Sequence, residues 1–214
     1  MQERASRVMA PERRRRLVRT AAREFATAGY EGASLNRIIR DCGLSKSSFY
    51  HYVDSKQALF DLVVQDLGDQ LTAALQVPAP GELAGPAFWE DVEDLLRRLL
   101  EVSRSNPAWT DLGRLFWAPG TPGGDGTALA RAGAALQAWL LGALEAGRAC
   151  GAVRDDLPAP LQADLTAAVL RALDEWGLRH PHALDGDEAH RLVVVQSALL
   201  RRVLAPDAPV PQAR

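Results

Sequence analysis

A chain of 214 residues, 47% of them hydrophobic, can bury one large core or one small and one medium core. No apolar run approaches the roughly 18 residues that a membrane-spanning helix requires, so we expect no association with a membrane. The net charge of −2 is unevenly distributed, because residues 1–56 carry 12 Arg or Lys against 6 Asp or Glu. This segment is therefore net +6 and the remainder −8, which is typical of a polyanion-binding end on an acidic body, although a solvated basic helix would give the same count.

The first predicted helix begins near a run of four arginines, Arg13–Arg16. Leu17, Ala21, Phe25 and Ala28 recur after it at helical spacing. The arginine run either follows a phosphate backbone or forms a charged outer face, and the sequence leaves both interpretations open. Residues 1–10 lack the apolar core of a signal peptide. The two cysteines, Cys42 and Cys150, have no CxxC spacing and suit a reducing cytoplasm, where we expect the protein.

Residues 34–56 contain two short helical patterns separated by a turn. Ser34 and Ser45 are N-cap candidates, because a serine oxygen accepts from the free N–H groups of a first helical turn. Gly43 can adopt the positive φ that a tight turn between helices needs. The apolar positions that can meet across this turn are Leu35, Ile38, Ile39, Leu44, Phe49 and Tyr52. The spacing predicts a helix-turn-helix, the motif that lays its second helix in the major groove of DNA.

The polar face of this segment distinguishes it from a purely structural helical hairpin. The candidate DNA-contacting residues are Ser34, Asn36, Lys46, Ser47, Ser48, Tyr50, His51 and Lys56. Tyr50 and Lys56 are expected to contact phosphates, since Lys56 begins the next helix. Base readout is assigned to Asn36, Lys46, Ser47, Ser48 and His51.

Three motifs within residues 16–59 resemble the TetR (tetracycline-repressor) family of bacterial transcription regulators. They are A-x-x-x-F-x-x-x-G-Y at residues 21–30, G-L-S-K-x-S-F-Y at residues 43–50 and Y-V-D-S-K-Q-A-L at residues 52–59. The family usually has Gly at the position of Ser47, a difference that affects how closely the recognition helix approaches DNA. Phe49, Val53 and Asp54 are milder departures. The resemblance implies a DNA-binding transcription regulator and covers about the first quarter of the chain.

Beyond residue 56 the pattern is helical throughout, without a strand pattern or an internal repeat. Helices are predicted over residues 55–76, 87–103, 107–117, 127–150, 160–178 and 187–204. We therefore expect an all-α fold of about nine helices, with an N-terminal three-helix DNA-binding domain over residues 1–54. Residues 55–205 would form a helical effector-binding and dimerisation domain, and residues 206–214, with three prolines, a flexible tail.

The last two predicted helices carry more apolar surface than a single neighbour would cover. By resemblance to the family, they would form a four-helix bundle with the same pair of a second subunit. The residues assigned to this dimer interface are Leu165, Val169, Leu173, Trp176, Val195 and Leu199. A homodimer also fits a helix-turn-helix that reads a two-fold symmetric operator, whereas the alternative is a thick monomer core.

All five tryptophans lie beyond residue 88. By resemblance, this region would enclose a small-molecule effector. The residues assigned to the effector pocket are Trp89, Trp109, Phe116, Trp117 and Trp139. An apolar, aromatic pocket would suit a lipophilic ligand, although aromatic residues at helical spacing also serve as core packing.

The sequence does not support an enzyme. His180, His182 and His190, with Asp185, Asp187 and Glu188, lack a second ligand pair at i, i+4 spacing, so we assign them a surface role and expect no metal and no cofactor. No nucleophile motif or glycine-rich nucleotide loop is present. The predicted function is a dimeric repressor that binds a double-stranded DNA operator and is released by a small, largely apolar effector. The alternative is a helical dimerisation module controlled by a protein partner, with weak or lost DNA binding; activation instead of repression also stays open.

Overall fold

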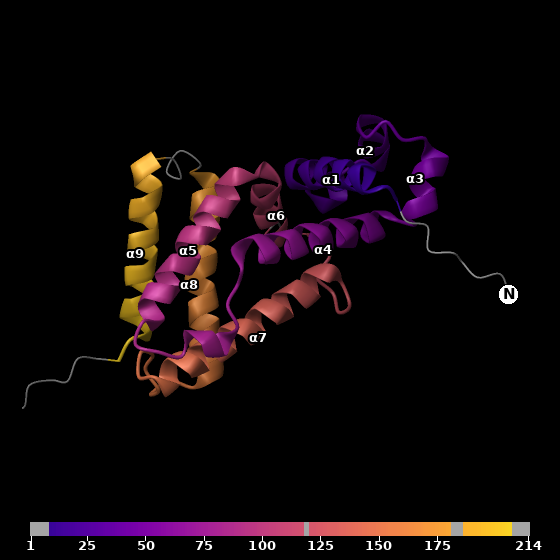
Figure 1. The fold of residues 1–214 in the computed structure, drawn as a ribbon. Helices are drawn as coiled ribbons and strands as arrows, with labels where there is room; N and C mark the ends of the chain where they lie inside the picture. Colours follow the sequence, from indigo (N-terminus) through magenta and orange to yellow (C-terminus); the bar gives the residue numbers. More distant parts are fainter. Residues whose placement is uncertain (1–8, 118–119, 181–185, 207–214) are drawn as a thin grey trace, which may run out of the picture. The chain divides into compact units, whose positions relative to one another are not determined.

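The computed structural model describes residues 9–117, 120–180 and 186–206, without the side chains of Trp117, Gly186 and Asp187. The described residues form nine α-helices and one short 3-10 helix, with no strand (Figure 1). The α-helices are α1 Pro11–Gly32, α2 Leu35–Asp41, α3 Lys46–Tyr52, α4 Lys56–Leu75, α5 Phe88–Ser105, α6 Pro107–Trp117, α7 Ala128–Ala149, α8 Ala159–Arg179 and α9 Gly186–Leu204. The predicted all-α class is confirmed.

The 3-10 helix, η1 Pro80–Leu83, lies between α4 and α5. Pro80 suits a first helical position because its missing N–H has no partner there. The Glu82 carboxylate accepts the backbone N–H of Ala79 at 2.8 Å, which closes the turn.

The chain divides into two compact units. The N-terminal unit comprises the described residues up to Ala74 together with Asn106–Gly133, and the C-terminal unit comprises Leu75–Ser105 together with the described residues from Ala134. The expected division into a DNA-binding domain over residues 1–54 and an effector-binding and dimerisation domain over residues 55–205 stays a prediction.

Aromatic packing fills the core of the N-terminal unit. Phe25 of α1 and Phe60 of α4 meet edge to face, with ring centroids 5.3 Å apart, and Tyr30 meets Phe60 at 5.4 Å. α1 also packs against α2 and α6. The fully buried apolar side chains of this core include Leu17, Phe25, Ile38, Phe49, Leu59, Phe60, Val63 and Leu115. Helices α2 and α3 are thereby fixed on a scaffold of α1 and α4.

The C-terminal unit is a bundle in which α5 and α8 each contact α9, and η1 contacts α5. Its core contains Leu83, Phe88, Trp89, Leu140, Leu144, Val153, Leu200 and Leu204. Gly147 of α7 is required there, because a Cβ at this position would collide with Val153 and with the ring of Phe88.

Large apolar side chains remain exposed on α8 and α9. They are Leu161, Leu165 and Trp176 on α8, and Val194, Val195 and Leu199 on α9. Of the residues assigned to a dimer interface, Val169 and Leu173 are half-buried, and Val169 packs against the core of its own unit. A face of this kind, on two adjacent helices of one bundle, is suited to burial against another apolar surface.

None of the helices in the described ranges has the length and apolarity needed to cross a membrane. His182 and Asp185 lie outside the described residues, as does the side chain of Asp187. The remaining described residues hold no group of three or more His, Cys, Asp or Glu side chains that could bind a metal.

Candidate nucleic-acid interface

Both helices of the predicted helix-turn-helix begin at the expected serines. The side chain of Ser34 accepts the backbone N–H of Arg37 at 3.3 Å, and that of Ser45 accepts the N–H of Ser48 at 3.1 Å. These bonds satisfy N–H groups that have no partner within the first helical turn. The two N-cap predictions are confirmed.

Gly43 ends α2 with a φ of +65°, as expected from the sequence. The N–H of Gly43 donates to the carbonyl of Arg40 at 3.0 Å, and that of Leu44 to the carbonyl of Ile39 at 3.0 Å. This pair of bonds is a Schellman motif, which a residue with a Cβ forms only with strain. Leu44, the residue after Gly43, packs onto the core of the N-terminal unit. The turn between α2 and α3 is therefore fixed both by the two hydrogen bonds of the Schellman motif and by the packing of Leu44.

Helix α3 has one buried face and one polar face. Phe49 is completely buried, and Val53 after the helix is buried as well. The opposite face exposes Lys46, Ser47 and His51, and Tyr50 is 50% exposed. Because Phe49 fixes the rotation of a helix only seven residues long, these polar side chains are held together on one outer surface. Asn36, at the beginning of α2, is also exposed.

The serines of α3 already bond to one another. Ser45 Oγ lies 3.0 Å from Ser47 Oγ and donates to Ser48 Oγ at 2.9 Å. Ser48 is half-buried, whereas Ser47 is exposed. Because Ser45 has one proton and donates it to Ser48, Ser47 is the donor to Ser45 and can only accept from a base, whereas Ser48 keeps its own proton for a base acceptor.

Lys56 is engaged within the protein at the beginning of α4. Its Nζ donates to the carbonyl of Glu31 at 2.8 Å and lies 5.0 Å from the centroid of the Tyr30 ring. The lysine thus ties α4 to the end of α1 in the absence of DNA. Its assignment as a phosphate contact stays a prediction.

Glu24 of α1 is a residue of this site that the sequence interpretation missed. Its side chain is 10% exposed, and its carboxylate accepts the backbone N–H of Ser34 at 2.9 Å and pairs with Arg37 Nη1 at 2.9 Å. It therefore holds the beginning of α2 against α1. No local signal identifies this role, because the partners are 10 and 13 residues away.

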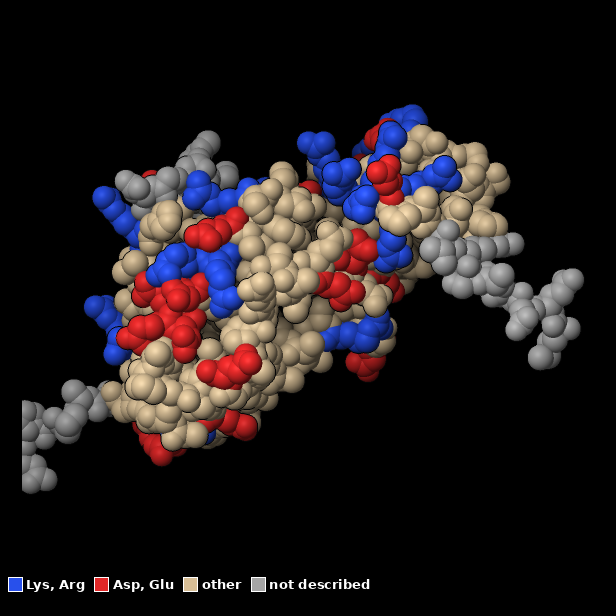
Figure 2. All heavy atoms as spheres, viewed as in Figure 1, with Lys and Arg blue, Asp and Glu red and all other residues tan. Residues whose placement is uncertain are grey.

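Arginines gather on the outer surface of α1 and α2 (Figure 2). Some are engaged: Arg14 pairs with Asp66 at 2.7 Å, and Arg16 donates to the carbonyl of Asp41 at 3.1 Å. Arg13, Arg19 and Arg23 are exposed along α1. Exposed cations of this kind favour contact with a polyanion.

The residues assigned to the effector pocket fall in both units. Trp89 and Trp139 belong to the C-terminal unit, where their indole N–H groups donate to the carbonyls of Ala152 at 3.1 Å and Pro78 at 2.8 Å. Trp109 and Phe116 belong to the N-terminal unit, and the side chain of Trp117 lies outside the described part. Within that part, the buried Nε1 of Trp109 is a side-chain donor for which the structure gives no acceptor.

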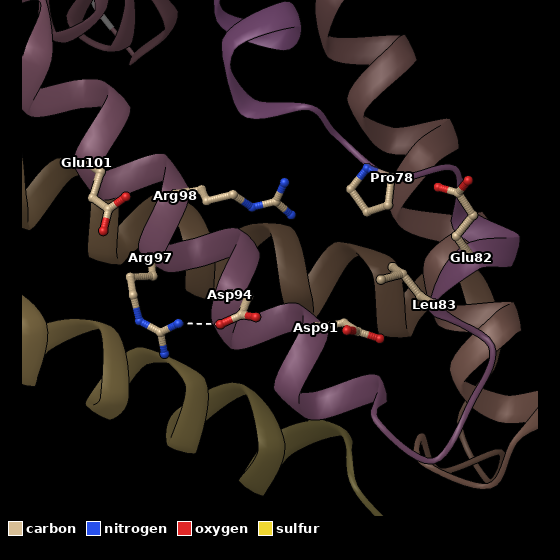
Figure 3. A pocket seen from close by; sticks show the side chains of 8 residues that line it. All are labelled: Pro78, Glu82, Leu83, Asp91, Asp94, Arg97, Arg98 and Glu101. Atoms are coloured by element: carbon tan, nitrogen blue, oxygen red, sulfur yellow. Dashed lines mark hydrogen bonds and ion pairs between the residues drawn. The ribbon is translucent and has the colours of Figure 1, made fainter.

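An open groove of about 500 Å³ runs along α5 in the C-terminal unit. Figure 3 shows its lining residues, Pro78, Glu82, Leu83, Asp91, Asp94, Arg97, Arg98 and Glu101. Arg97 pairs with Glu93 and Asp94, and Arg98 donates to the carbonyl of Leu75 at 2.9 Å. This charged groove contains none of the aromatic residues assigned to the effector pocket.

Comparison with known proteins relates the N-terminal segment to a family of regulators. Residues 17–63 match the family model described as bacterial regulatory proteins, tetR family. Two relatives from Bacillus subtilis (strain 168), the uncharacterized HTH-type transcriptional regulators YdgC and YuxN, are 38% identical over 55 residues and 30% identical over 91 residues. These matches cover 26% and 42% of this chain but only 28% and 31% of the relatives, so the chain spans less than a third of their length.

Solved structures of similar fold cover nearly the whole chain. A TetR-family regulator from Shewanella sp. PV-4 has a TM-score of 0.70 and 19% identity, covering 91% of this chain and 98% of that one. A regulator of the same family from Chloroflexus aurantiacus has a TM-score of 0.67 and 22% identity, with coverages of 92% and 95%. SmeT, the repressor of the Stenotrophomonas maltophilia multidrug efflux pump SmeDEF, has a TM-score of 0.69 and 14% identity, with coverages of 94%.

Proposed function

Because the chain belongs to the TetR family of bacterial regulatory proteins, we propose that it is a homodimeric repressor that a small, largely apolar ligand releases from its DNA operator. The coarser function, transcription regulation through a helix-turn-helix, follows from the family. The dimer, the repression and the ligand response are the proposed parts.

The polar face of α3 carries the proposal for operator binding. Lys46, Ser47 and His51 are exposed on one side of a helix whose other side is fixed by the buried Phe49. A lysine can donate to guanine O6 or N7, and hydroxyl groups can bond to several base edges. The exposed arginines of α1 supply sequence-independent attraction to the phosphates.

Homodimerisation is supported by the apolar side chains exposed on α8 and α9. Val195 is 52% exposed and Leu165 40%, which is unfavourable in water for residues of this size. The same patch on a second copy would cover both surfaces across a two-fold axis. Two α3 helices related by this axis would then read two half-sites of one operator.

The ligand response is supported by Trp109 on α6. A buried N–H without an acceptor costs stability, and a ligand carrying an acceptor oxygen or nitrogen would remove that cost. We assign the effector to a class of largely apolar molecules with one such acceptor. SmeT, the repressor of a multidrug efflux pump, has a similar fold. We propose that this chain likewise controls the removal of lipophilic compounds.

Release from DNA requires that the ligand discriminate between two conformations. A near-complete shift needs preferential binding to the DNA-free conformation of about 5.5 kcal/mol. A ligand that binds both conformations equally would leave the protein on its operator.

The test uses a labelled operator duplex, obtained by selection from random sequences, and a panel of lipophilic compounds. A compound that releases the duplex should also shift the tryptophan emission, because all five tryptophans lie outside the helix-turn-helix. Trp109→Phe should weaken release at least about fivefold through loss of the indole N–H, while binding to the operator without the compound should be unchanged.

Release that is insensitive to Trp109→Phe would place the sensing site elsewhere. If no small molecule releases the duplex but a protein from the same cells does, the dimerisation module controlled by a protein partner becomes the better description.

A further inference from the structure

A carboxylate from α4 holds the beginning of α7. Asp61 Oδ1 accepts the backbone N–H of Ala128, the first residue of α7, at 2.7 Å, although 67 residues separate them. The first N–H groups of a helix have no intrahelical partner, and the positive end of the helix dipole attracts a carboxylate. Thr127 satisfies another of these groups, since its Oγ1 accepts from Ala130 at 3.2 Å. The position of the first turn of α7 thus depends on Asp61.

The second oxygen of Asp61 continues the connection toward α1. Asp61 Oδ2 accepts from Gln57 Nε2 at 3.1 Å, and Gln57 Oε1 lies 3.3 Å from the Tyr30 hydroxyl, which donates to it. An ionised carboxylate only accepts, so it orients the amide of Gln57 with its oxygen toward Tyr30. The four residues Ala128, Asp61, Gln57 and Tyr30 form a directional chain of hydrogen bonds, here called the Asp61 chain, from α7 through α4 to α1.

Tyr30 lies where α1 ends and the chain turns toward α2. Gly29 has a φ of +70°, and α2 begins after two further residues, Ala33 and Ser34. The Tyr30 ring packs against Phe25 and Phe60. Burial, followed by the charges of Glu31 and Asp61, raises the pKa of Tyr30, which keeps its hydroxyl a donor at neutral pH. The far end of the Asp61 chain is therefore at the entrance to the helix-turn-helix.

The other end of the Asp61 chain is Ala128 of α7, a helix that has residues in both units. Residues 128–133 of α7 lie in the N-terminal unit, whereas the rest of this 22-residue helix lies in the C-terminal unit. Leu140 and Leu144 of α7 are part of the C-terminal core. A change in that core can alter the first turn of α7, because both are parts of one continuous helix.

We propose that Asp61 is a positioning residue that couples the first turn of α7 to the end of α1, and thereby to the DNA-binding helices. The inference rests on the proposed function only for its DNA-binding consequence, since the coupling itself exists in the free protein. By reciprocity, DNA that orders α2 and α3 also orders the first turn of α7.

Hydrogen exchange of the backbone amides tests the coupling first in the free protein. Asp61→Ala should accelerate exchange about fivefold or more both in residues 127–131 and in residues 30–34. Gln57→Met, which leaves the Asp61 contact to Ala128 in place, should accelerate exchange in residues 30–34 only. Asp69→Asn, on an exposed position of the same helix, serves as the control and should change neither segment. Melting curves establish that each variant is folded.

The second part adds the operator duplex selected by the wild-type protein. The duplex should slow exchange in residues 127–131 of the wild type about fivefold, and this slowing should be lost in Gln57→Met. Unchanged exchange in residues 30–34 of both Asp61→Ala and Gln57→Met would overturn the proposal, whatever the protein binds. A wild-type protein that selects no duplex would instead contradict the proposed function, and the free-protein result would still decide the coupling.

Discussion

At the residue scale, the side chains proposed to contact DNA differ in the hydrogen bonds that they already make. Lys46 and His51 are exposed, whereas Ser47 and Ser48 share the Ser45 hydroxyl and Lys56 holds the Glu31 carbonyl. The bonds that these serines and Lys56 already make fix the directions of their remaining donor and acceptor sites, which restricts how they can meet a base or a phosphate. We therefore expect Lys46 to contribute more to base discrimination than either serine.

Lys46→Ala and Lys56→Ala should have different consequences for DNA binding. Lys46→Ala should change which operator variants are preferred, at a cost of about 1–3 kcal/mol for the lost base contact. Lys56→Ala should weaken binding to all duplexes and reduce the salt dependence by about one unit of slope per contact. Binding to operator variants and to random DNA at several salt concentrations separates the two effects. Since Lys56 also bonds to Glu31, its variant is compared at a temperature where melting shows it to be folded. Identical sequence preferences for Lys46→Ala and wild type would remove Lys46 from base readout.

The two cysteines should react at very different rates. Burial raises the pKa of the Cys42 thiol above its usual 9.0, with Asp41 acting in the same direction and Thr20 and Arg16 opposing it. Cys150 is exposed. At pH 8 a maleimide should label Cys150 rapidly, and Cys42 only when the protein opens, because the thiolate is the reactive form. Cys150→Ser should abolish the rapid phase. Equal labelling rates in the folded protein would show that Cys42 is accessible.

The raised pKa of Cys42 also has a consequence for stability. The folded protein prefers the neutral thiol of Cys42. The stability that this preference contributes is fully present below about pH 9 and is lost as the pH rises through the raised pKa that Cys42 has in the folded protein. Labelling of Cys42 in the Cys150→Ser variant should therefore accelerate above pH 9, both from the thiolate and from the more frequent opening of the protein.

At the scale of elements, the sequence predicts those features whose cause is local. The N-caps Ser34 and Ser45 and the glycine of the turn act on residues within three positions, so their spacing alone identified them. Glu24 and Asp61 could not be identified in this way. Their partners are 10 and 67 residues away, and only the fold brings them together.

Replacement of Gly43 by alanine tests the role of the turn. The φ of +65° is unfavourable for a residue with a Cβ, and we expect Gly43→Ala to destabilise the protein by about 1–2 kcal/mol. Gly68, within α4 and with free space around a Cβ, is the matched control, and Gly68→Ala should instead stabilise by about 0.5–1 kcal/mol. Denaturant unfolding measures both. A Gly43→Ala variant as stable as Gly68→Ala would contradict the turn assignment.

At the scale of the whole molecule, the aromatic residues show what helical spacing leaves undetermined. Four tryptophans were assigned to one effector pocket by sequence, but Trp89 and Trp139 have backbone acceptors and pack with the C-terminal core, while Trp109 has a buried, unpaired N–H. Whether an indole N–H finds an acceptor depends on distant segments such as residues 78 and 152, which periodicity does not locate. The pocket assignment therefore stays a prediction, with Trp109 its best supported member.

A charge on α9 should disrupt the proposed dimer. Val195→Glu would bury an unpaired carboxylate in the interface, and the dimer should dissociate to folded monomers because that burial is costly. Leu136→Glu on α7 is the matched control, since Leu136 is 51% exposed and Val195 52%. Light scattering gives the mass of each variant, and circular dichroism shows that it is folded. A Val195→Glu protein that remains dimeric would place the interface elsewhere.

Selection of DNA from random duplexes shows whether this protein recognises an operator. Folded wild-type protein should enrich a two-fold symmetric sequence, with half-sites about one turn of DNA or a multiple apart, as two α3 helices related by a dimer axis require. Lys46→Ala should enrich a different half-site, whereas Asp69→Asn, on α4, should enrich the same one. Failure of the folded, wild-type protein to enrich any sequence above the input would contradict the account of this chain as an operator-binding regulator.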